Sequence, residues 1–231
     1  MKIDAHQHFW NYSEKEYAWI PTNIPLHRDW LPADLAPLPK AASLDGCIAA
    51  QARESVEESR LLLDRSNHNP IIKEVVDWVD LQSDKVEESL GELSVHPRFA
   101  GVRHVVQQLS GQPFVVDHIA KPFIKDGKLS PWKEQIQDLA KSKNISRKVP
   151  GMVREAKPDA WQKEDFHPYR DIVFEAFGGD RPMFGFGWPV CLLSGTYPPV
   201  HGLVGDYTEK LPTAARVKIF GENCSKFHGV K

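Results

Sequence analysis

Two histidines near the N-terminus, His6 and His8, have the residue type and spacing to act together. They lie in residues 1–8, a β-prone segment that predicts a short strand. Side chains two residues apart on a strand project from the same face, so both imidazoles would point toward one place. Neutral imidazole binds Zn²⁺ and similar metals well. The pair predicts a site that binds a metal ion or a substrate oxygen. Because the motif is short, the alternative is that these are two ordinary histidines with no shared function.

Other polar and aromatic side chains recur where successive predicted strands end. They are Gln51 and Arg53 after the second strand, Trp78 and Asp80 on the third, Arg103 and His104 on the fourth, His118 and Lys121 on the next, and Trp188 and Cys191 on the last. Any one of them could be a core residue with its hydrogen bonds satisfied. Their recurrence at one end favours a shared site, because active sites of (β/α) barrels form at the carboxyl ends of the strands.

An alternation of strands and helices must position these residues. Apolar runs predict strands over residues 46–51, 71–81 and 99–107, and helical spacing predicts helices over residues 55–67 and 84–93, the order of a parallel sheet. Residues 11–39, rich in proline and aromatics, predict a long loop with a short helix near residues 32–38. The later segments predict strands over 114–119, 144–153 and 181–190, and helices over 132–141, 165–177, 200–211 and 213–220.

The alternation breaks between Gln107 and Pro113. The predicted strands on either side both have the apolar character of buried strands. Parallel neighbours need a crossover of about a dozen or more residues, which this join cannot supply. Either the two strands form an antiparallel hairpin around Ser110 and Gly111, or one unit of the alternation is missing here.

The composition excludes several classes of function. The 231 residues are 41% hydrophobic with a net charge of -2, so nothing suggests a nucleic-acid or anionic membrane partner. Cys47, Cys191 and Cys224 are widely spaced, which favours a reducing compartment over a disulfide framework. No apolar run approaches a membrane span, and Asp4 and His6 interrupt any signal-peptide core. We expect one cytoplasmic domain over residues 1–231.

Several motifs along the chain carry a family resemblance. They are Asp4-Ala5-His6-Gln7-His8-Phe9-Trp10, Gln51-Ala52-Arg53, residues 101–107, Asp117-His118-Ile119-Ala120-Lys121-Pro122, residues 181–191 and residues 219–223. With these motifs the chain resembles the amidohydrolase-related lactonases, relatives of L-fuconolactonase, L-rhamnonolactonase and 2-pyrone-4,6-dicarboxylate lactonase. The resemblance covers most of the chain.

The resemblance implies a TIM-barrel-like (β/α) barrel of the metal-dependent hydrolase type. The enzyme would open a sugar lactone or related cyclic ester by adding water to its carbonyl, which needs a polarising group and a base. Some relatives bind one divalent metal, such as Zn²⁺ or Mn²⁺, and others act without metal, so both alternatives stay open. The implied catalytic or metal-binding residues are His6, His8 and His118, and the candidate substrate-binding residues are Gln51, Arg103, His104, Trp10, Trp78 and Trp188.

One departure from the family removes a catalytic group. The family usually has Gly-Ser-Asp-Trp-Pro on its last barrel strand, and that Asp is the general base and a potential metal ligand. Here residues 185–189 read Gly-Phe-Gly-Trp-Pro, so Gly187 stands where the Asp is expected. Loss of a catalytic base typically costs about 10²–10⁴ in rate. Asp117, Asp80 and Glu222 are the candidates for a substitute base, although none lies at the family position.

The other departures concern the barrel itself. In the family, the place of the short join between Gln107 and Pro113 is taken by a longer segment that contains a helix, a strand and another helix. This difference agrees with the break in the alternation. Such a barrel must close on seven strands, pair its strands differently, or keep an open edge that favours association, for example into a homo-oligomer. Residues 145–151 also lack the usual Lys-Leu-Ser-Gly, with Pro150 where a central strand tolerates it poorly.

Two functions therefore compete. The first is a lactonase-type hydrolase whose small-molecule substrate is a sugar lactone. The second is a shortened, catalytically impaired relative, a splice form or gene-model fragment included, that binds a ligand or mediates association. The arrangement of His6, His8 and His118 bears on both, since ring nitrogens within about 3–4 Å of one point would favour a metal site.

Overall fold

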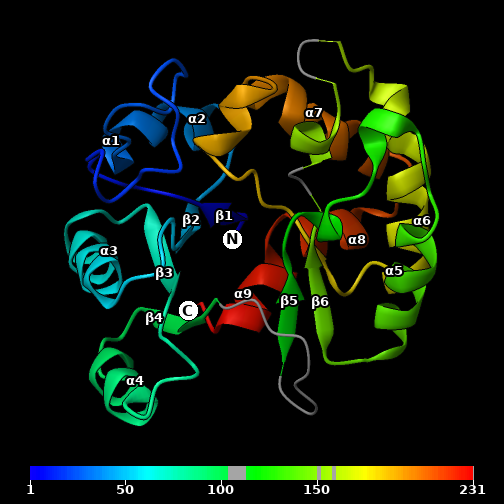
Figure 1. Cartoon of the computed structure of the whole chain (residues 1–231). Coiled ribbons are helices and arrows are strands. Elements are labelled where there is room, and N and C mark those ends of the chain that lie inside the picture. Colours follow the sequence, from blue (N-terminus) through cyan, green and yellow to red (C-terminus); the bar gives the residue numbers. More distant parts are fainter. Residues whose placement is uncertain (104–112, 150–151, 158–159, 231) are drawn as a thin grey trace.

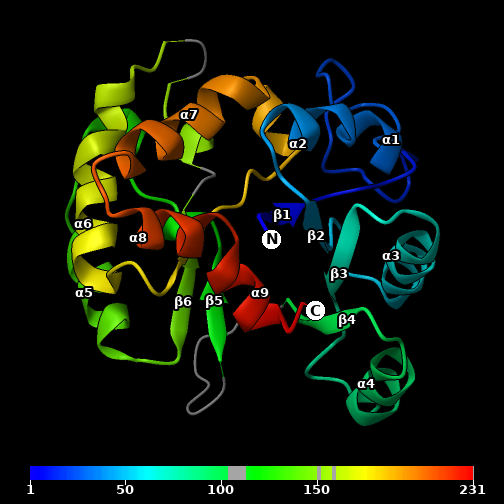
Figure 2. The same ribbon diagram turned by 180° about the vertical axis from the view of Figure 1, so that it is seen from behind.

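The computed structural model describes residues 1–103, 113–149, 152–157 and 160–230, and within them two parallel sheets (Figures 1 and 2). The first sheet has the order β1-β2-β3-β4 and the second the order β5-β6-β7. Every pair of neighbouring strands is parallel, as the alternation predicts. The strands are β1 (Ile3–Gln7), β2 (Gly46–Ala50), β3 (Ile72–Asp77), β4 (Phe99–Val102), β5 (Phe114–Val116), β6 (Ile145–Lys148) and β7 (Pro182–Met183).

Helices cover the outer faces of both sheets. In Figures 1 and 2, α3 (Val56–His68) and α4 (Val86–Ser94) lie outside the first sheet, and α5 (Trp132–Lys141) and α6 (His167–Phe177) lie outside the second. The remaining helices are α1 (Pro32–Leu35), α2 (Pro37–Ala41), α7 (Tyr197–Thr208), α8 (Thr213–Val217), the π-helical η6 (Lys218–Glu222) and α9 (Asn223–His228). None of the described helices combines the length and the apolar character needed to cross a membrane.

Local chemistry explains where these helices begin and end. Ser55 caps α3, because its Oγ accepts a hydrogen bond of 3.1 Å from the backbone N–H of Glu58. Trp132 and Ile136 form the buried stripe of α5. Proline at the start of α6 fits the first helical turn, and Gly178 ends that helix with φ +66°.

The second sheet closes against β1 through the segment that follows β7. The N–H of Ala5 donates to the Phe184 carbonyl at 2.8 Å, and the N–H of His8 donates to the Trp188 carbonyl at 2.7 Å. A parallel bridge joins Gln7 to Trp188. This connection joins the two sheets into one TIM-barrel-like arrangement of parallel strands surrounded by helices.

On the opposite side, β4 and β5 belong to different sheets. Ser110 and Gly111, where the hairpin alternative places its turn, lie outside the described residues. The described parts of the two flanking strands do not pair, so the hairpin is wrong for them. Each pairs parallel with its other neighbour, β3 for β4 and β6 for β5.

The C-terminal helix α9 lies between the two sheets in both ribbon views (Figures 1 and 2). Its Cys224 belongs to a small buried cluster with Ile3, Ala5, Ile48, Val76 and Met183. Gly221 in the preceding η6 has no room for a side chain, because a Cβ there would lie 1.9 Å from the Met1 carbonyl oxygen. The two ends of the chain are therefore packed directly against each other.

Several strands are shorter in the structure than the sequence predicts. The strand expected over residues 144–153 ends at Lys148, and Met152–Glu155 forms a 3-10 helix instead. The strand expected over residues 181–190 has only the two residues of β7, because the glycine-rich segment that follows leaves the regular strand. The strand expected over 71–81 ends at Asp77. The strand expected over 114–119 ends at Val116, because the chain then enters a left-handed turn.

Candidate active site

Three histidines from two separate β-segments lie together at the carboxyl end of β1. His6 is within β1, His8 follows that strand, and His118 lies in the turn after β5. The His6 ring is edge-on to both others, with centroid separations of 4.6 Å to His8 and 4.6 Å to His118. His6 is fully buried, whereas His118 is partly exposed. The structure thus brings together the three imidazoles that the sequence analysis selected.

A left-handed turn places His118 beside His6. The φ angles of residues 118, 119, 120 and 121 are +49°, +46°, +56° and +51°. This conformation is uncommon for residues with a side chain, and its strain must be offset by surrounding contacts. One such contact is the hydrogen bond of 2.7 Å from Trp132 Nε1 to the Ile119 carbonyl. The turn ends β5 early and points the chain back toward β1.

An ion network lies next to these rings. Asp117 pairs with Arg103 through Oδ2 and Nε at 2.7 Å, and with Lys148 through Oδ1 and Nζ at 3.1 Å. Lys148 Nζ also lies 3.0 Å from His6 Nδ1, and His6 Nδ1 lies 3.6 Å from Asp117 Oδ1. Burial alone would raise the pKa of Asp117, but Lys148 and Arg103 overcome that effect and hold the pKa well below its ordinary value.

Lys148 is the site residue that the sequence analysis missed. Its side chain is 1% exposed, and it lies on β6 with its ammonium between Asp117 and His6. The available signal was a lysine inside a segment expected to be a strand. A buried ammonium needs a partner, and sequence spacing alone does not reveal one contributed by a different strand.

All three imidazoles are neutral at pH 7. Burial, followed by the charge of Lys148, lowers the pKa of His6 well below its ordinary value. Burial and Arg103 lower the pKa of His8 to about 3. Burial lowers the pKa of His118 to about 4. Because the Lys148 ammonium donates to Nδ1 of His6, the proton of that neutral ring resides on Nε2.

Gln51 and Arg103 also meet, as the sequence analysis predicts. Arg103 Nη1 donates to the Gln51 side-chain oxygen at 2.8 Å and to its backbone carbonyl at 3.2 Å. The loop after Gln51 is fixed by Glu58, which accepts hydrogen bonds of 2.8 Å from the N–H groups of Ala52 and Arg53. Arg103 is therefore oriented from two sides. His104, expected to bind substrate, lies outside the described residues.

The tryptophans do not share one role. Trp10 is fully buried and donates from Nε1 to the Arg28 carbonyl at 2.9 Å. Trp188 is 1% exposed and packs against Trp30 with a centroid separation of 5.0 Å. For these two rings the core alternative holds, since neighbouring aromatic rings cover them and they do not line an open pocket. Trp78, just after β3, is partly exposed.

The candidates for a substitute base lie apart from one another. Asp80 is exposed and accepts a hydrogen bond of 2.9 Å from the N–H of Gln82 in a surface turn. Glu222 is exposed in η6. Only Asp117 contacts the network around the histidines, and both of its oxygens face cations.

Gly187 lies directly against the histidines. Its N–H donates to the His6 carbonyl at 2.7 Å. A Cβ at this position would lie 3.3 Å from His118 Cε1 and 3.8 Å from His6 Cδ2. Its φ of +73° is in the left-handed region, which glycine adopts without strain. A side chain at position 187 would therefore enter the space between the two rings.

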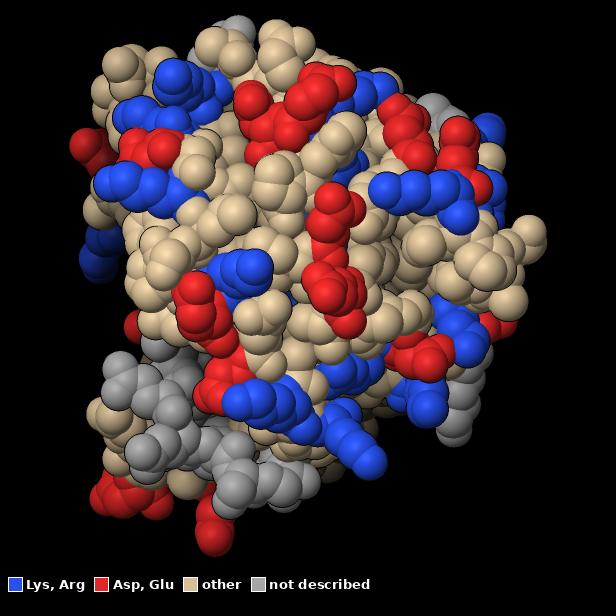
Figure 3. Space-filling model, turned by 90° about the vertical axis from the view of Figure 1, so that its right-hand side faces the viewer, with Lys and Arg blue, Asp and Glu red and all other residues tan. Residues whose placement is uncertain are grey.

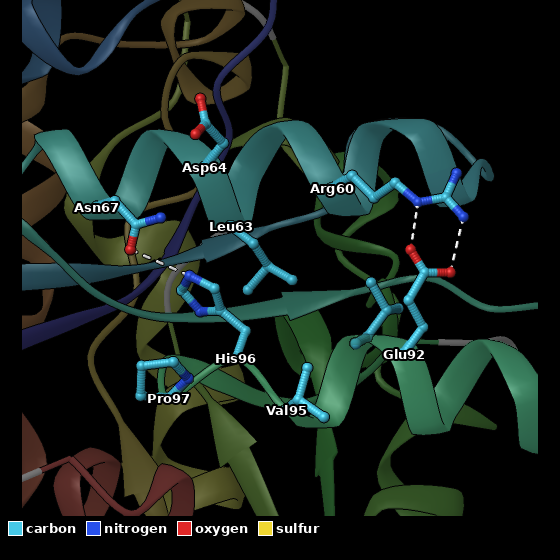
Figure 4. A pocket seen from close by; sticks show the side chains of 9 residues that line it. Arg60, Leu63, Asp64, Asn67, Glu92, Val95, His96 and Pro97 are labelled. Atoms are coloured by element: carbon cyan, nitrogen blue, oxygen red, sulfur yellow. Dashed lines mark hydrogen bonds and ion pairs between the residues drawn. The ribbon is translucent and has the colours of Figure 1, made fainter.

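A hollow of about 360 Å³ lies away from the histidines, on the outer face between α3 and α4 (Figure 4). Four of its polar lining residues are paired with each other. Arg60 binds Glu92 through two bonds of 2.6 and 2.8 Å, and His96 Nε2 lies 3.1 Å from Asn67 Oδ1. These side chains satisfy one another, so the histidine cluster remains the better candidate for chemistry.

The fold and this cluster define a TIM-barrel-like protein with a histidine-rich site at its strand ends. A model of the family described as Amidohydrolase matches residues 105–230. The L-fucono-1,5-lactonases of Burkholderia ambifaria and Burkholderia multivorans are 27% and 28% identical to this chain, covering 99% and 100% of it and 96% of each relative. The chain belongs to the amidohydrolase family and is an enzyme of the hydrolase class.

Solved structures agree with this assignment. The crystal structure of an amidohydrolase from Burkholderia multivorans with bound zinc superposes with a TM-score of 0.92 at 28% identity, covering 100% of both chains. An amidohydrolase 2 from Bifidobacterium longum has a TM-score of 0.68 at 16% identity, over 100% of this chain and 99% of the other, and shares the fold.

The described side chains, as arranged here, do not fit a bound metal ion. Metal coordination through His6 Nε2 requires a lone pair on that nitrogen, but the Lys148 ammonium at Nδ1 leaves Nε2 protonated. Gly187 supplies no carboxylate. Across the described ranges, no group of three His, Cys, Asp or Glu side chains has the geometry to hold a metal.

Proposed function

We propose that this enzyme hydrolyses a sugar-acid lactone by adding water to the ring carbonyl. The observation that carries the proposal is the meeting of three neutral imidazoles with the Arg103–Asp117–Lys148 network at the carboxyl ends of the strands. The two similar L-fucono-1,5-lactonases support a lactone as substrate. The small molecule would be held by hydrogen bonds rather than by a broad charged surface. One face, shown in Figure 3, has positive and negative side chains interspersed.

Arg103 is suited to bind the carbonyl oxygen. Its side chain is 34% exposed, and its bonds to Asp117 and Gln51 fix the plane of the guanidinium. A pre-oriented cation stabilises the negative charge that develops on the oxygen as water adds. A free surface arginine would lose this advantage through side-chain entropy.

His118 is the better candidate for the base. A neutral imidazole has one nitrogen lone pair, and burial lowers the pKa of His118 to about 4, so the ring is neutral at pH 7. Asp117 is a poorer base, because Lys148 and Arg103 hold its pKa well below the ordinary value. In this scheme water adds to the carbonyl as its proton moves to His118. The ring C–O bond then breaks and the leaving oxygen takes that proton.

A specific observation also favours the second function, ligand binding without turnover. Gly187 supplies no carboxylate next to His6 and His118, so this chain has lost a group that could accept a proton. The two functions differ in acid release, and a pH-indicator assay on aldono-1,5-lactones separates them. Acid release above the spontaneous rate supports the hydrolase.

The matched variants are His118→Asn and His68→Asn. We expect His118→Asn to lower kcat/KM by about 10²–10⁴, the usual contribution of a general base. His68 is exposed on α3, with its side chain 75% exposed, so His68→Asn should leave the rate unchanged. No acid release from any aldonolactone, with or without added Zn²⁺ or Mn²⁺, would exclude hydrolysis and leave ligand binding.

A further inference from the structure

We propose that the site binds a carboxylate group, with an oxygen beside Gly187 between His6 and His118. The enzyme would therefore hold the open-chain sugar acid more tightly than a neutral polyol with the same hydroxyl pattern. The inference rests on the proposed function, since the acid is the product of lactone opening.

The site contains a buried donor that lacks an acceptor. His6 is fully buried, and its Nδ1 accepts from Lys148, which places the ring proton on Nε2. Nε2 has no hydrogen-bond partner in the part of the chain that the structure describes. A buried N–H without an acceptor costs free energy, so a ligand oxygen that accepts from it is favoured.

A side chain at position 187 would point between His6 and His118. The three atoms nearest to a Cβ built on Gly187 are His118 Cε1 at 3.3 Å, His6 Cδ2 at 3.8 Å and His118 Nδ1 at 4.0 Å. A carboxylate carried by residue 187 would therefore lie between these two rings. Because residue 187 is a glycine, a carboxylate supplied by a ligand can approach the same two rings.

The ion network beside the histidines has an excess of positive charge. Two cations, Arg103 and Lys148, share the single carboxylate of Asp117, so this network has a net charge of about +1. Arg154 adds a further positive potential at His118. The nearby Asp4 already accepts hydrogen bonds from the backbone N–H groups of His6 at 3.1 Å and Phe186 at 2.9 Å. An anion is the ligand that balances the excess positive charge.

The experiment compares galactonate with galactitol by isothermal titration calorimetry. The two probes share their chain length and hydroxyl pattern and differ in a carboxylate against a CH₂OH group. We expect galactonate to bind at least about tenfold more tightly, which corresponds to about 1.4 kcal/mol. The preference should shrink as NaCl is added, because salt screens the partly exposed cation.

The matched variants are Gly187→Asp and Gly187→Asn. Both residues tolerate a left-handed φ better than other side chains, and they have nearly the same size. The aspartate supplies the missing charge, so the preference for galactonate should fall to about twofold or less. The asparagine fills the same space without the charge, so galactonate should bind more weakly than to the wild-type enzyme. Because the excess positive charge remains, galactonate should still bind more tightly than galactitol. Circular dichroism and thermal melts verify that both variants fold.

Equal affinity for the two probes in the wild-type enzyme would overturn the proposal, as would an unchanged preference in Gly187→Asp. If neither variant folds, the ¹⁵N signal of His6 Nε2 decides. It should shift with galactonate and not with galactitol, and the absence of a galactonate shift would overturn the proposal. A competition titration with formate tests whether the carboxylate group alone is recognised. Displacement of galactonate by formate supports a site that binds any carboxylate. Binding needs no turnover, so an enzyme that binds galactonate but releases no acid from lactones refutes hydrolysis only.

Discussion

Replacing Lys148 with methionine tests the network at the centre of the site. Methionine has a similar length and no charge, so the change removes the ammonium and keeps most of the packing. Breaking a buried ion pair by removing one partner costs about 3–5 kcal/mol. Asp117 is 18% exposed and keeps Arg103 at 2.7 Å, so we expect the lower end of that range, about 3 kcal/mol. Urea unfolding followed by circular dichroism measures this loss.

The chain provides a matched control on its surface. Lys141 and Asp138 form an ion pair of 2.9 Å, with side chains 79% and 77% exposed. Solvent and salt screen such a pair, which contributes about 0–1 kcal/mol. Lys141→Met should therefore change the free energy of unfolding by less than about 1 kcal/mol. The difference between the two lysines isolates the effect of burial.

The double variant with Asp117→Asn separates the ion pair from packing. If Lys148 acts through Asp117, the loss in the double variant should be smaller than the sum of the single losses by about 1–3 kcal/mol. The His6 tautomer should also change in Lys148→Met, because Nδ1–H can then donate toward Asp117 Oδ1, 3.6 Å away. Additive losses together with an unchanged ¹⁵N pattern for His6 would refute the reasoning.

Three further predictions concern stability. The pKa of His118 is about 4 in the folded state and 6.5 in the unfolded state, so its contribution to the free energy of unfolding is fully present above pH 6.5. Up to about 3 kcal/mol of this stability is lost as the pH falls toward 4. Urea unfolding at pH 7 and pH 4.5 should show this loss, and His118→Asn should reduce it. Gly221→Ala should destabilise the protein by about 1–3 kcal/mol, because the added methyl clashes with Met1. Gly91→Ala in α4 is the control: its added methyl meets open space, so it should stabilise the protein by about 0.5–1 kcal/mol in the same urea unfolding experiment. Glu58→Gln should cost about 1.5–3 kcal/mol and raise KM, because an amide cannot accept all the hydrogen bonds that fix the loop after Gln51; an unchanged KM would contradict this role.

The sequence predicts the parts of the fold that local patterns control. The helix expected over residues 132–141 has those bounds in α5, and the Ser55 cap of α3 is present. Parallel strands follow from the alternation, because each helix supplies the crossover that a parallel pair requires. The shared position of His6 and His8 follows from strand periodicity together with their place at a strand end.

The features that the sequence does not predict depend on contacts between distant segments. The partners of Lys148 come from positions 6 and 117, so no local window contains the network. The left-handed turn at His118 lacks the glycine that usually indicates one. Trp10 and Trp188 have types suited to a sugar pocket, but their surroundings place them in the core. Residue type alone does not distinguish these two roles.

The packing of α9 against β1 imposes an order on biosynthesis. β1 leaves the ribosome long before α9, so Ile3 and Ala5 acquire their apolar neighbour Cys224 only after more than 200 further residues have been made. Domains fold as units during translation, so β1, which bears His6, stays incompletely covered until α9 has been made. Nascent chains stalled before residue 221 should therefore be open to proteases and to chaperones at β1, although that strand has had longer to fold than the segments that follow it.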